Sequence, residues 1–198
     1  MRQWVSVAQI VPRTAAEGPG WRFALWFQGC PLRCPGCCNP EMLPFVGGTQ
    51  RSVEELVAGI AASDVEGITL LGGEPFAHVD GASALASATQ ALGKSVMVFS
   101  GYTLEQLHER ENAKSLLAHT DILVDGPYLR ESPDTERRWV GSTNQRIHFL
   151  TGRYQADDPR WRTRNTLEIR LQGGELSVNG FPARSAVGLW RRPHAGRP

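Results

Sequence analysis

The stretch Gly67-Ile68-Thr69-Leu70-Leu71-Gly72-Gly73-Glu74-Pro75 indicates the fold class, because a short apolar run stops at a pair of glycines. Apolar runs of this length between turn residues are typical of buried strands. Helical patterns lie on both sides of it. Ser52, with Glu55 three residues later, predicts a helix that begins there and runs to about residue 63, and an Ala-rich segment predicts another over residues 79–92.

The alternation of strand and helix continues in both directions along the chain. Strands that alternate with helices of this length form βαβ units, with a parallel sheet and right-handed crossovers. We therefore predict an α/β fold, in a chain of 198 residues that is too short for a closed eight-unit barrel of about 250 residues. The pattern predicts a helix over residues 103–118 and strands over residues 4–11, 21–27, 95–100, 121–125 and 146–150.

The alternation stops near Gly152. Residues 164–171 and 175–179, joined by Gly173-Gly174, predict a β-hairpin. The Arg- and Pro-rich end from Arg191 is expected to be loose. We therefore divide the chain into a core over residues 1–151 and a C-terminal extension over residues 152–198.

Composition and charge limit the class of protein. The hydrophobic content is 41% and the charged content 21%, which excludes a disordered or collagen-like chain. We expect a soluble cytoplasmic protein that does not contact a membrane, because no apolar run approaches the length of a membrane span and residues 1–4 begin no signal-peptide pattern.

The formal charge is unevenly distributed along the chain. There are 8 basic and 13 acidic residues up to Pro127, and 13 basic and 7 acidic residues after it. A basic second part suits either a negatively charged partner or a solvated Arg-rich face. We favour the solvated face and expect no nucleic acid, because no aromatic-interleaved RNA-binding motif accompanies the charges.

All four cysteines, Cys30, Cys34, Cys37 and Cys38, fall within nine residues of one another. A disulfide framework would spread its cysteines over the chain to join distant segments, so a cluster this tight indicates a metal site. The site is embedded in a loop of turn-forming residues that follows a predicted strand.

The spacing of these cysteines favours an iron–sulfur cluster. Cys30, Cys34 and Cys37 form a Cys-x3-Cys-x2-Cys array, and three thiolates leave one iron of a cuboidal cluster open. Cys38 is not expected to be a ligand, because adjacent residues of an extended segment point to opposite sides. A structural zinc knuckle remains the alternative, although the second, distant ligand pair that zinc ribbons use is missing.

The unusual residues lie where predicted strands end. The cysteine loop follows one strand, Gly72-Gly73-Glu74-Pro75 follows another, and Ser100 and Asp125 follow two more. Parallel sheets place ligands beyond the carboxyl ends of their strands. We therefore expect these four segments to meet around one site.

Several of these motifs together resemble the radical S-adenosylmethionine superfamily. They are Gly18-Pro19-Gly20-Trp21-Arg22, Trp26-Phe27-Gln28-Gly29 before the cysteine array, Cys37-Cys38-Asn39-Pro40 and the Gly72–Pro75 turn. Leu123–Tyr128 and Arg138–Arg146 are similar to later segments of one branch, the activating enzymes of anaerobic (class III) ribonucleotide reductase, which are glycyl radical enzyme activases. The resemblance covers about residues 1–151.

The resemblance implies a fold and a set of cofactors. The fold is a partial (βα)6-type barrel, here with a C-terminal β-hairpin extension. Cys30, Cys34 and Cys37 would hold a [4Fe-4S] cluster whose open iron binds S-adenosylmethionine. Reductive cleavage of that cofactor would give a 5′-deoxyadenosyl radical, and the protein would supply orientation and exclude water and oxygen.

The resemblance also implies residues that hold S-adenosylmethionine. Gly72 and Gly73 would let the strand end approach it, and Glu74 would accept from its ammonium group. Ser100 and Asp125 would contact its methionine or ribose part, with an ordinary cap or turn as the alternative for each. Tyr102 would pack near its adenine or in the core. The resemblance implies no particular catalytic residue.

The implied activity is formation of a glycyl radical on a partner enzyme, with a flavodoxin or ferredoxin-type protein as electron donor. Two alternatives remain. One is a stand-alone enzyme acting on a small molecule or peptide, with the extension over the cavity, and the other is a zinc-knuckle binding module without catalysis. Gly36 and Cys38 depart from the wider superfamily, which often has aromatic residues there, so adenine contact by this loop is in doubt.

Overall fold

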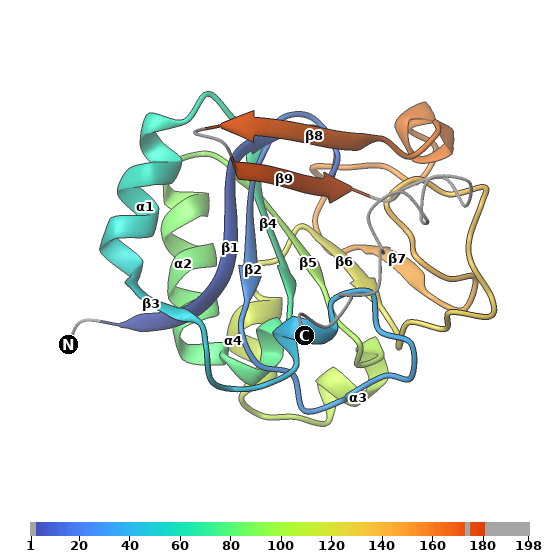
Figure 1. The fold of residues 1–198 in the computed structure, drawn as a ribbon, viewed down its shortest axis with the longest axis horizontal. Helices are drawn as coiled ribbons and strands as arrows, with labels where there is room; N and C mark the ends of the chain where they lie inside the picture. Colours follow the sequence, from blue (N-terminus) through green and yellow to red (C-terminus); the bar gives the residue numbers. More distant parts are fainter. Residues whose placement is uncertain (1–2, 173–174, 181–198) are drawn as a thin grey trace, which may run out of the picture.

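Four parallel strands form the centre of a seven-stranded sheet whose order is β3-β1-β2-β4-β5-β6-β7 (Figure 1). The computed structural model describes residues 3–172 and 175–180. The seven strands are β1 (Trp4–Thr14), β2 (Arg22–Phe27), β3 (Thr49–Ser52), β4 (Gly67–Gly72), β5 (Ser95–Phe99), β6 (Ile122–Asp125) and β7 (Arg146–Phe149).

The predicted α/β class is confirmed, and the sheet is not closed into a barrel. Strands β2, β4, β5 and β6 are parallel to one another, whereas β1, β3 and β7 pair antiparallel with their neighbours. The short link over residues 15–21 explains the first antiparallel pair, because a parallel crossover needs about a dozen residues or more. The predicted run of parallel units is therefore limited to four strands.

Helices cover one face of the sheet, which we call the helix face. They are α1 (Val53–Ala62), α2 (Val79–Ala91), α3 (Leu104–His108) and α4 (Ala113–Leu117). Of the short 3-10 helices η1 (Pro40–Met42), η2 (Pro75–Ala77) and η3 (Pro159–Arg162), η1 and η3 pack on the opposite face. The predicted cap of α1 is present, because the Ser52 side chain accepts from the Glu55 N–H. No helix among the described residues is both long and apolar enough to span a bilayer.

The single helix predicted over residues 103–118 is wrong, because the structure divides it into α3 and α4. The capping box of Thr103 and Gln106 is present at its start. At Arg110 the N–H donates to the carbonyl of Leu107, three residues back, at 3.1 Å. This tighter turn ends the α-helical bonding, and α4 begins at Ala113.

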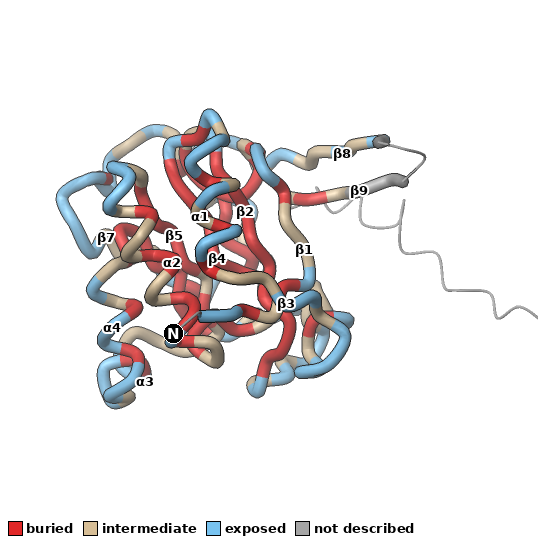
Figure 2. The backbone as a smooth tube through the Cα atoms, turned by 90° about the vertical axis from the view of Figure 1, so that its left-hand side faces the viewer, coloured by how far each residue is buried: buried red, intermediate tan, exposed pale blue. Residues whose placement is uncertain are grey.

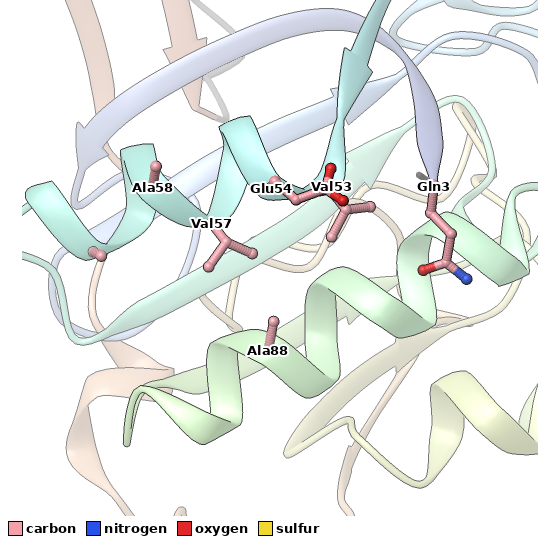
Figure 3. Close-up of a pocket in the computed structure, with 7 residues that line it drawn as sticks. Gln3, Val53, Glu54, Val57, Ala58 and Ala88 are labelled. Atoms are coloured by element: carbon pink, nitrogen blue, oxygen red, sulfur yellow. The ribbon is translucent and has the colours of Figure 1, made fainter. Parts of the chain in front are cut away.

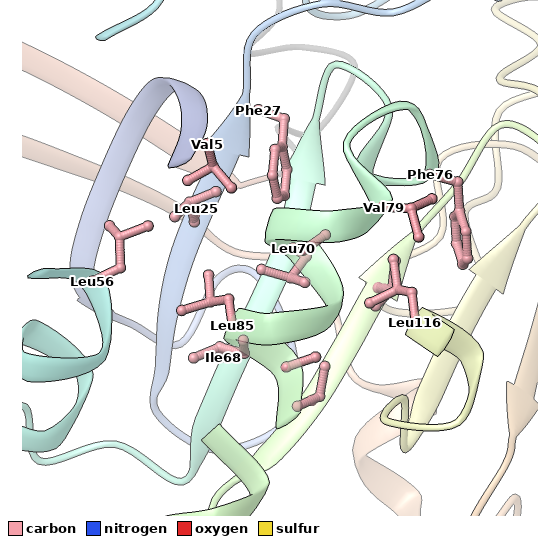
Figure 4. Packing of buried hydrophobic residues seen from close by; sticks show 14 of the residues in the cluster. Val5, Leu25, Phe27, Leu56, Ile68, Leu70, Phe76, Val79, Leu85 and Leu116 are labelled. Carbon is pink, nitrogen blue, oxygen red and sulfur yellow. The ribbon is translucent and has the colours of Figure 1, made fainter. Parts of the chain in front are cut away.

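The main core lies between the sheet and the helices. Leu56 of α1 and Leu85 of α2 point toward Leu25, Ile68 and Leu70 of the central strands (Figure 4). Alternate residues of the same strands, such as Trp26 and Leu71, are buried on the opposite face. Burial on both faces explains why these strands are continuous apolar runs (Figure 2).

The predicted C-terminal hairpin is confirmed as β8 (Leu167–Gln172) and β9 (Glu175–Gly180), which form a separate two-stranded sheet. It lies near the start of β2, at the opposite end of the sheet from the cysteine loop (Figure 1). The side chain of Asn179 fastens it there by donating to Thr14 Oγ1 at 2.9 Å. The predicted Gly173-Gly174 turn and the end from Arg191 lie outside the described residues. The division of the chain at residue 151 stays a prediction.

Candidate metal centre

The cysteine loop leaves the end of β2 and returns through η1, at the end of the sheet where the parallel strands finish (Figure 1). Cys30 is buried, Cys34 and Cys37 are half-buried, and Cys38 is exposed. The loop therefore presents its thiols at the carboxyl ends of β2 and β4, as the order of motifs along the sequence predicted.

Hydrogen bonds join the two limbs of this loop at its base. The buried Gln28 carboxamide donates to the carbonyls at both ends of the segment 41–44, at 3.1 and 2.7 Å. The N–H groups of Gly29 and Cys30 donate to the two carbonyls between them, at 2.9 and 3.0 Å. Gln28 holds the returning limb, a role that the sequence motif did not reveal. In the sequence, the one indication of this role is a polar residue directly after the apolar run 23–27.

The glycine pair at the end of β4 packs against β2 and the first residues of the loop. A Cβ on Gly73 would lie 2.3 Å from the Gly29 carbonyl oxygen, and one on Gly72 would lie 2.6 Å from Trp26 Cβ. The φ of Gly72 is +98°, which also disfavours side chains. The close approach that these glycines permit is therefore seen between β4 and the cysteine loop.

Two further contacts hold the tip of the loop. Leu32 lies over Gly101, where a Cβ would be 2.6 Å from Leu32 Cδ1. The Arg130 side chain, from the connection between β6 and β7, lies over Gly36, where a Cβ would be 2.8 Å from Arg130 Cδ. The loop thus touches the segments that follow β4, β5 and β6. Neither Leu32 nor Arg130 could be assigned from sequence, because both contacts join distant segments.

The Glu74 carboxylate is buried and joins the ends of β4 and β5. It accepts from the Phe76 N–H at 3.0 Å, the Ser100 hydroxyl at 3.0 Å and the Gly101 N–H at 2.9 Å. Burial raises the pKa of Glu74 to about 7, against the effect of these donors. Three of about four acceptor positions of the carboxylate are thus used within the protein.

The structure brings Ser100 to the same cluster but turns Asp125 to the helix face. The Leu104 N–H donates to Asp125 Oδ2 at 2.6 Å, and the Arg146 guanidinium donates to both oxygens at 3.1 and 2.6 Å. Burial alone would raise the pKa of Asp125, but the Arg146 guanidinium and the Leu104 N–H lower it. Cofactor contact by Asp125 stays a prediction, and these bonds favour its alternative, a turn and cap residue.

Tyr102 and His148 also lie on the helix face. The Tyr102 ring packs against the main core, with the Arg110 guanidinium 4.6 Å from its centroid. His148 Nε2 lies 3.1 Å from Asp125 Oδ2. Both positions favour packing over contact with a ligand at the cysteine loop.

The surroundings shift the pKa values of two of the three thiols in opposite directions. The Cys38 thiol lowers the pKa of Cys37 to about 6, and the Asn39 N–H donates to Cys37 Sγ at 3.4 Å. Burial raises the pKa of Cys30. The described residues contain no group of three His, Cys, Asp or Glu side chains placed to hold one ion. A cluster does not require such a group, since each thiolate binds a different iron.

A groove between α1 and α2 lies away from these cysteines. It has a volume of about 420 Å³ and is lined by residues that include Val53, Val57 and Ala88 (Figure 3). It contains neither a cysteine nor a strand end. The candidate site is therefore defined by the cysteine loop and its contacts.

Comparisons with known proteins agree with this geometry. A family model described as a 4Fe-4S single cluster domain matches residues 16–148. The anaerobic ribonucleoside-triphosphate reductase-activating protein of Vibrio cholerae is 33% identical over 153 residues, covering 72% of this chain and 97% of that protein. The protein of the same name from Enterobacteria phage T4 is 32% identical over 146 residues, covering 70% and 90% of the two chains.

More distant similarities extend the comparison. The protein of that name from Escherichia coli K12 is 28% identical over 152 residues, covering 72% of this chain and 97% of the relative. The crystal structure of Escherichia coli QueE has a TM-score of 0.41 and 20% identity, covering 50% of this chain and 53% of that one.

Proposed function

This chain belongs to the family of anaerobic ribonucleoside-triphosphate reductase-activating proteins and contains a 4Fe-4S single cluster domain, and on this premise we propose that it generates a glycyl radical on a partner enzyme. It would do so as a radical S-adenosylmethionine oxidoreductase. The observation that carries the proposal is the cysteine loop, which is bonded at its base and lies against the ends of three parallel strands.

Cys30, Cys34 and Cys37 are the proposed ligands of the [4Fe-4S] cluster, and Cys38 is not. When bound, the reduced cluster supplies the electron that splits the sulfonium of S-adenosylmethionine into methionine and a 5′-deoxyadenosyl radical. The protein's part is to hold the thiols, orient the cofactor and exclude water. The base of the loop, fastened by Gln28, supports the first of these tasks.

Gly72, Gly73, Glu74, Ser100 and Asp125 are proposed to form the S-adenosylmethionine site. The N–H groups of Gly73 and Glu74 already donate to the carbonyls of Phe27 and Gly29, so direct contact with the cofactor is proposed for the carbonyls of Gly72 and Gly73. Glu74 supports them, because its carboxylate fixes the segment at residues 100 and 101 relative to that turn. Asp125 acts from the helix face by holding the start of α3 at Leu104.

The proposed substrate is an anaerobic ribonucleotide reductase, which is what the names of the relatives state that they activate. Supporting this, the sheet is open rather than closed, which leaves a path for a loop of a protein partner. We further propose a flavodoxin or ferredoxin-type electron donor and a cytoplasmic location.

The experiment begins with anaerobic reconstitution, followed by analysis of iron and sulfide. Alanine at Cys30, Cys34 or Cys37 is expected to abolish the visible charge-transfer absorbance, while Cys38→Ala, the matched control in the same loop, retains it. Loss of the cluster in Cys38→Ala with retention in Cys37→Ala would overturn the ligand assignment.

The second step tests the reaction. The loaded protein, dithionite and S-adenosylmethionine are mixed with an anaerobic ribonucleotide reductase, and the glycyl radical is measured by electron paramagnetic resonance. We expect a radical on the partner and an equivalent amount of methionine. Methionine release without a protein radical would point to a stand-alone enzyme, and binding of zinc without iron would point to a knuckle.

A further inference from the structure

The side chain of Arg130 lies against the cysteine loop. Its Cδ, Cβ and Cγ atoms would be 2.8, 3.1 and 3.5 Å from a Cβ on Gly36, the residue before Cys37. Gly36 has a φ of +72° and no side chain, so the aliphatic part of Arg130 lies over the loop backbone. Arg130 is exposed, and no carboxylate of the described residues pairs with it.

The connection that carries Arg130 is held in place by hydrogen bonds. The Leu129 N–H donates to Ser142 Oγ at 3.1 Å. Gln145 Oε1 accepts from two consecutive backbone N–H groups, the second of them that of Ser142, at 3.0 and 3.1 Å. Gln145 Nε2 donates to the Gly126 carbonyl at 3.0 Å. The backbone next to Arg130 is therefore fixed from both ends of the connection.

Two other arginines of the same region have their charge compensated by a carboxylate. Arg137 pairs with Asp134 at 2.7 Å, and Arg146 pairs with Asp125 at 2.6 Å. Arg130 differs from them because its guanidinium has no such partner among residues 3–172 and 175–180. It is a net positive charge beside the segment that carries Cys34 and Cys37.

A positive charge at this place affects electron uptake. Reduction adds one negative charge to a cluster, and a nearby cation stabilises the more negative form. The effect is screened by salt, because the Debye length is about 10 Å at 0.1 M ionic strength. Resting on the function proposed above, we propose that Arg130 raises the reduction potential of the cluster on the cysteine loop and so eases its one-electron reduction.

The test compares the midpoint potentials of anaerobically reconstituted proteins, followed by electron paramagnetic resonance at low and high salt. Arg130→Gln and Arg130→Met both keep methylene groups over Gly36 but remove the charge, whereas Arg130→Lys keeps the charge. At low salt we expect the neutral variants to have about a threefold smaller equilibrium constant for reduction, which is about 30 mV for one electron. Arg130→Lys should stay near the unsubstituted protein.

Arg162→Gln is the matched control, because Arg162 is an exposed arginine of η3 that also pairs with no described carboxylate. Its potential should equal that of the unsubstituted protein, and high salt should reduce the difference for Arg130→Gln. Equal potentials of Arg130→Met and Arg162→Gln at low salt would overturn the inference while leaving the proposed function intact. Failure of the unsubstituted protein to take up iron and sulfide would instead overturn the proposed function.

Discussion

Gly73 shows how one side chain, or its lack, governs the candidate site. The Gly29 carbonyl accepts from the Glu74 N–H at 2.9 Å, so β4 and the cysteine loop are in backbone contact at this point. From the sequence, the glycine pair was expected to approach a ligand. The structure adds a reason within the protein itself, because the space beside Gly73 is filled by the loop.

Gly73→Ala is therefore expected to impair the loop itself. A Cβ 2.3 Å from a backbone oxygen must displace one of the two segments, which should lower the free energy of unfolding by about 2 kcal/mol and reduce iron uptake. Gly152→Ala is the control, because a Cβ there meets nothing within 4 Å. Urea unfolding and iron analysis measure both effects. Full stability and full iron content in Gly73→Ala would contradict this account.

At the residue level, what could be predicted depended on local pattern. The cysteine spacing and the turn after β4 are contiguous in sequence, so their place at the strand ends followed directly. The direction of Asp125 did not, because one position of register decides whether a strand residue faces the helices or the opposite side. Gln28 and Arg130 act on distant segments, and no neighbouring residue signals their partners.

The conformation of the connection between β6 and β7 was the hardest part of the fold to predict from the sequence. It spans residues 126–145 and contains no helix, but side-chain hydrogen bonds fix its backbone. Trp139 has a φ of +61°, and its N–H donates to Asn165 Oδ1 at 2.7 Å. Such a backbone is unusual for a bulky residue and is held here by a contact from the C-terminal extension. Local propensity could not have predicted it.

Gln145 is expected to stabilise this connection, because its side chain bonds to three backbone groups. Gln145→Leu leaves two N–H groups and the Gly126 carbonyl without their partner, which should cost about 3 kcal/mol of unfolding free energy. Gln50→Leu, at an exposed position of β3, is the matched control and should change stability by less than about 0.5 kcal/mol. Equal urea midpoints for the two variants would show that the bonds of Gln145 do not hold the loop.

Across the whole molecule, ion pairs join the basic second part of the chain to the acidic first part. Arg146 pairs with Glu105 and Asp125, and Arg160 approaches Glu66, so basic residues of the second part meet acidic residues of the first. These pairs show that part of the basic charge is compensated within the fold, and the solvated Arg-rich face favoured from the sequence stays a prediction. The family resemblance, which the comparisons confirm, rested on motifs and not on this charge pattern.

Glu17 lies in the link between β1 and β2 and is buried near the hairpin. Its carboxylate accepts from Asn179 Nδ2 at 3.3 Å. Burial raises the pKa of Glu17 from 4.5 to about 7, with Glu168 adding to the rise and Asn179 and Arg170 opposing it. The native state therefore holds a proton that the unfolded chain releases between these two pH values.

This difference predicts a loss of stability as pH rises. Below about pH 4.5 both states are protonated, and between pH 4.5 and 7 the unfolded state alone ionises, so the free energy of unfolding falls, by about 3 kcal/mol in total. Glu17→Gln keeps the shape and the acceptor oxygen but cannot ionise. Its stability relative to the unsubstituted protein should rise by that amount from pH 4 to pH 8 in urea unfolding. A constant difference across this range would refute the assignment.

All four cysteines lie in one loop, so that loss of the cluster would not disturb the rest of the fold. The base of the loop is closed by main-chain and amide bonds, and the core beneath it is built from apolar side chains on both faces of the sheet. Assembly of the scaffold thus requires no iron. Destruction of the cluster by oxygen would leave a folded protein with its thiols still in place. Once these thiols are reduced, a new cluster can be assembled on the same protein without synthesis of a new chain.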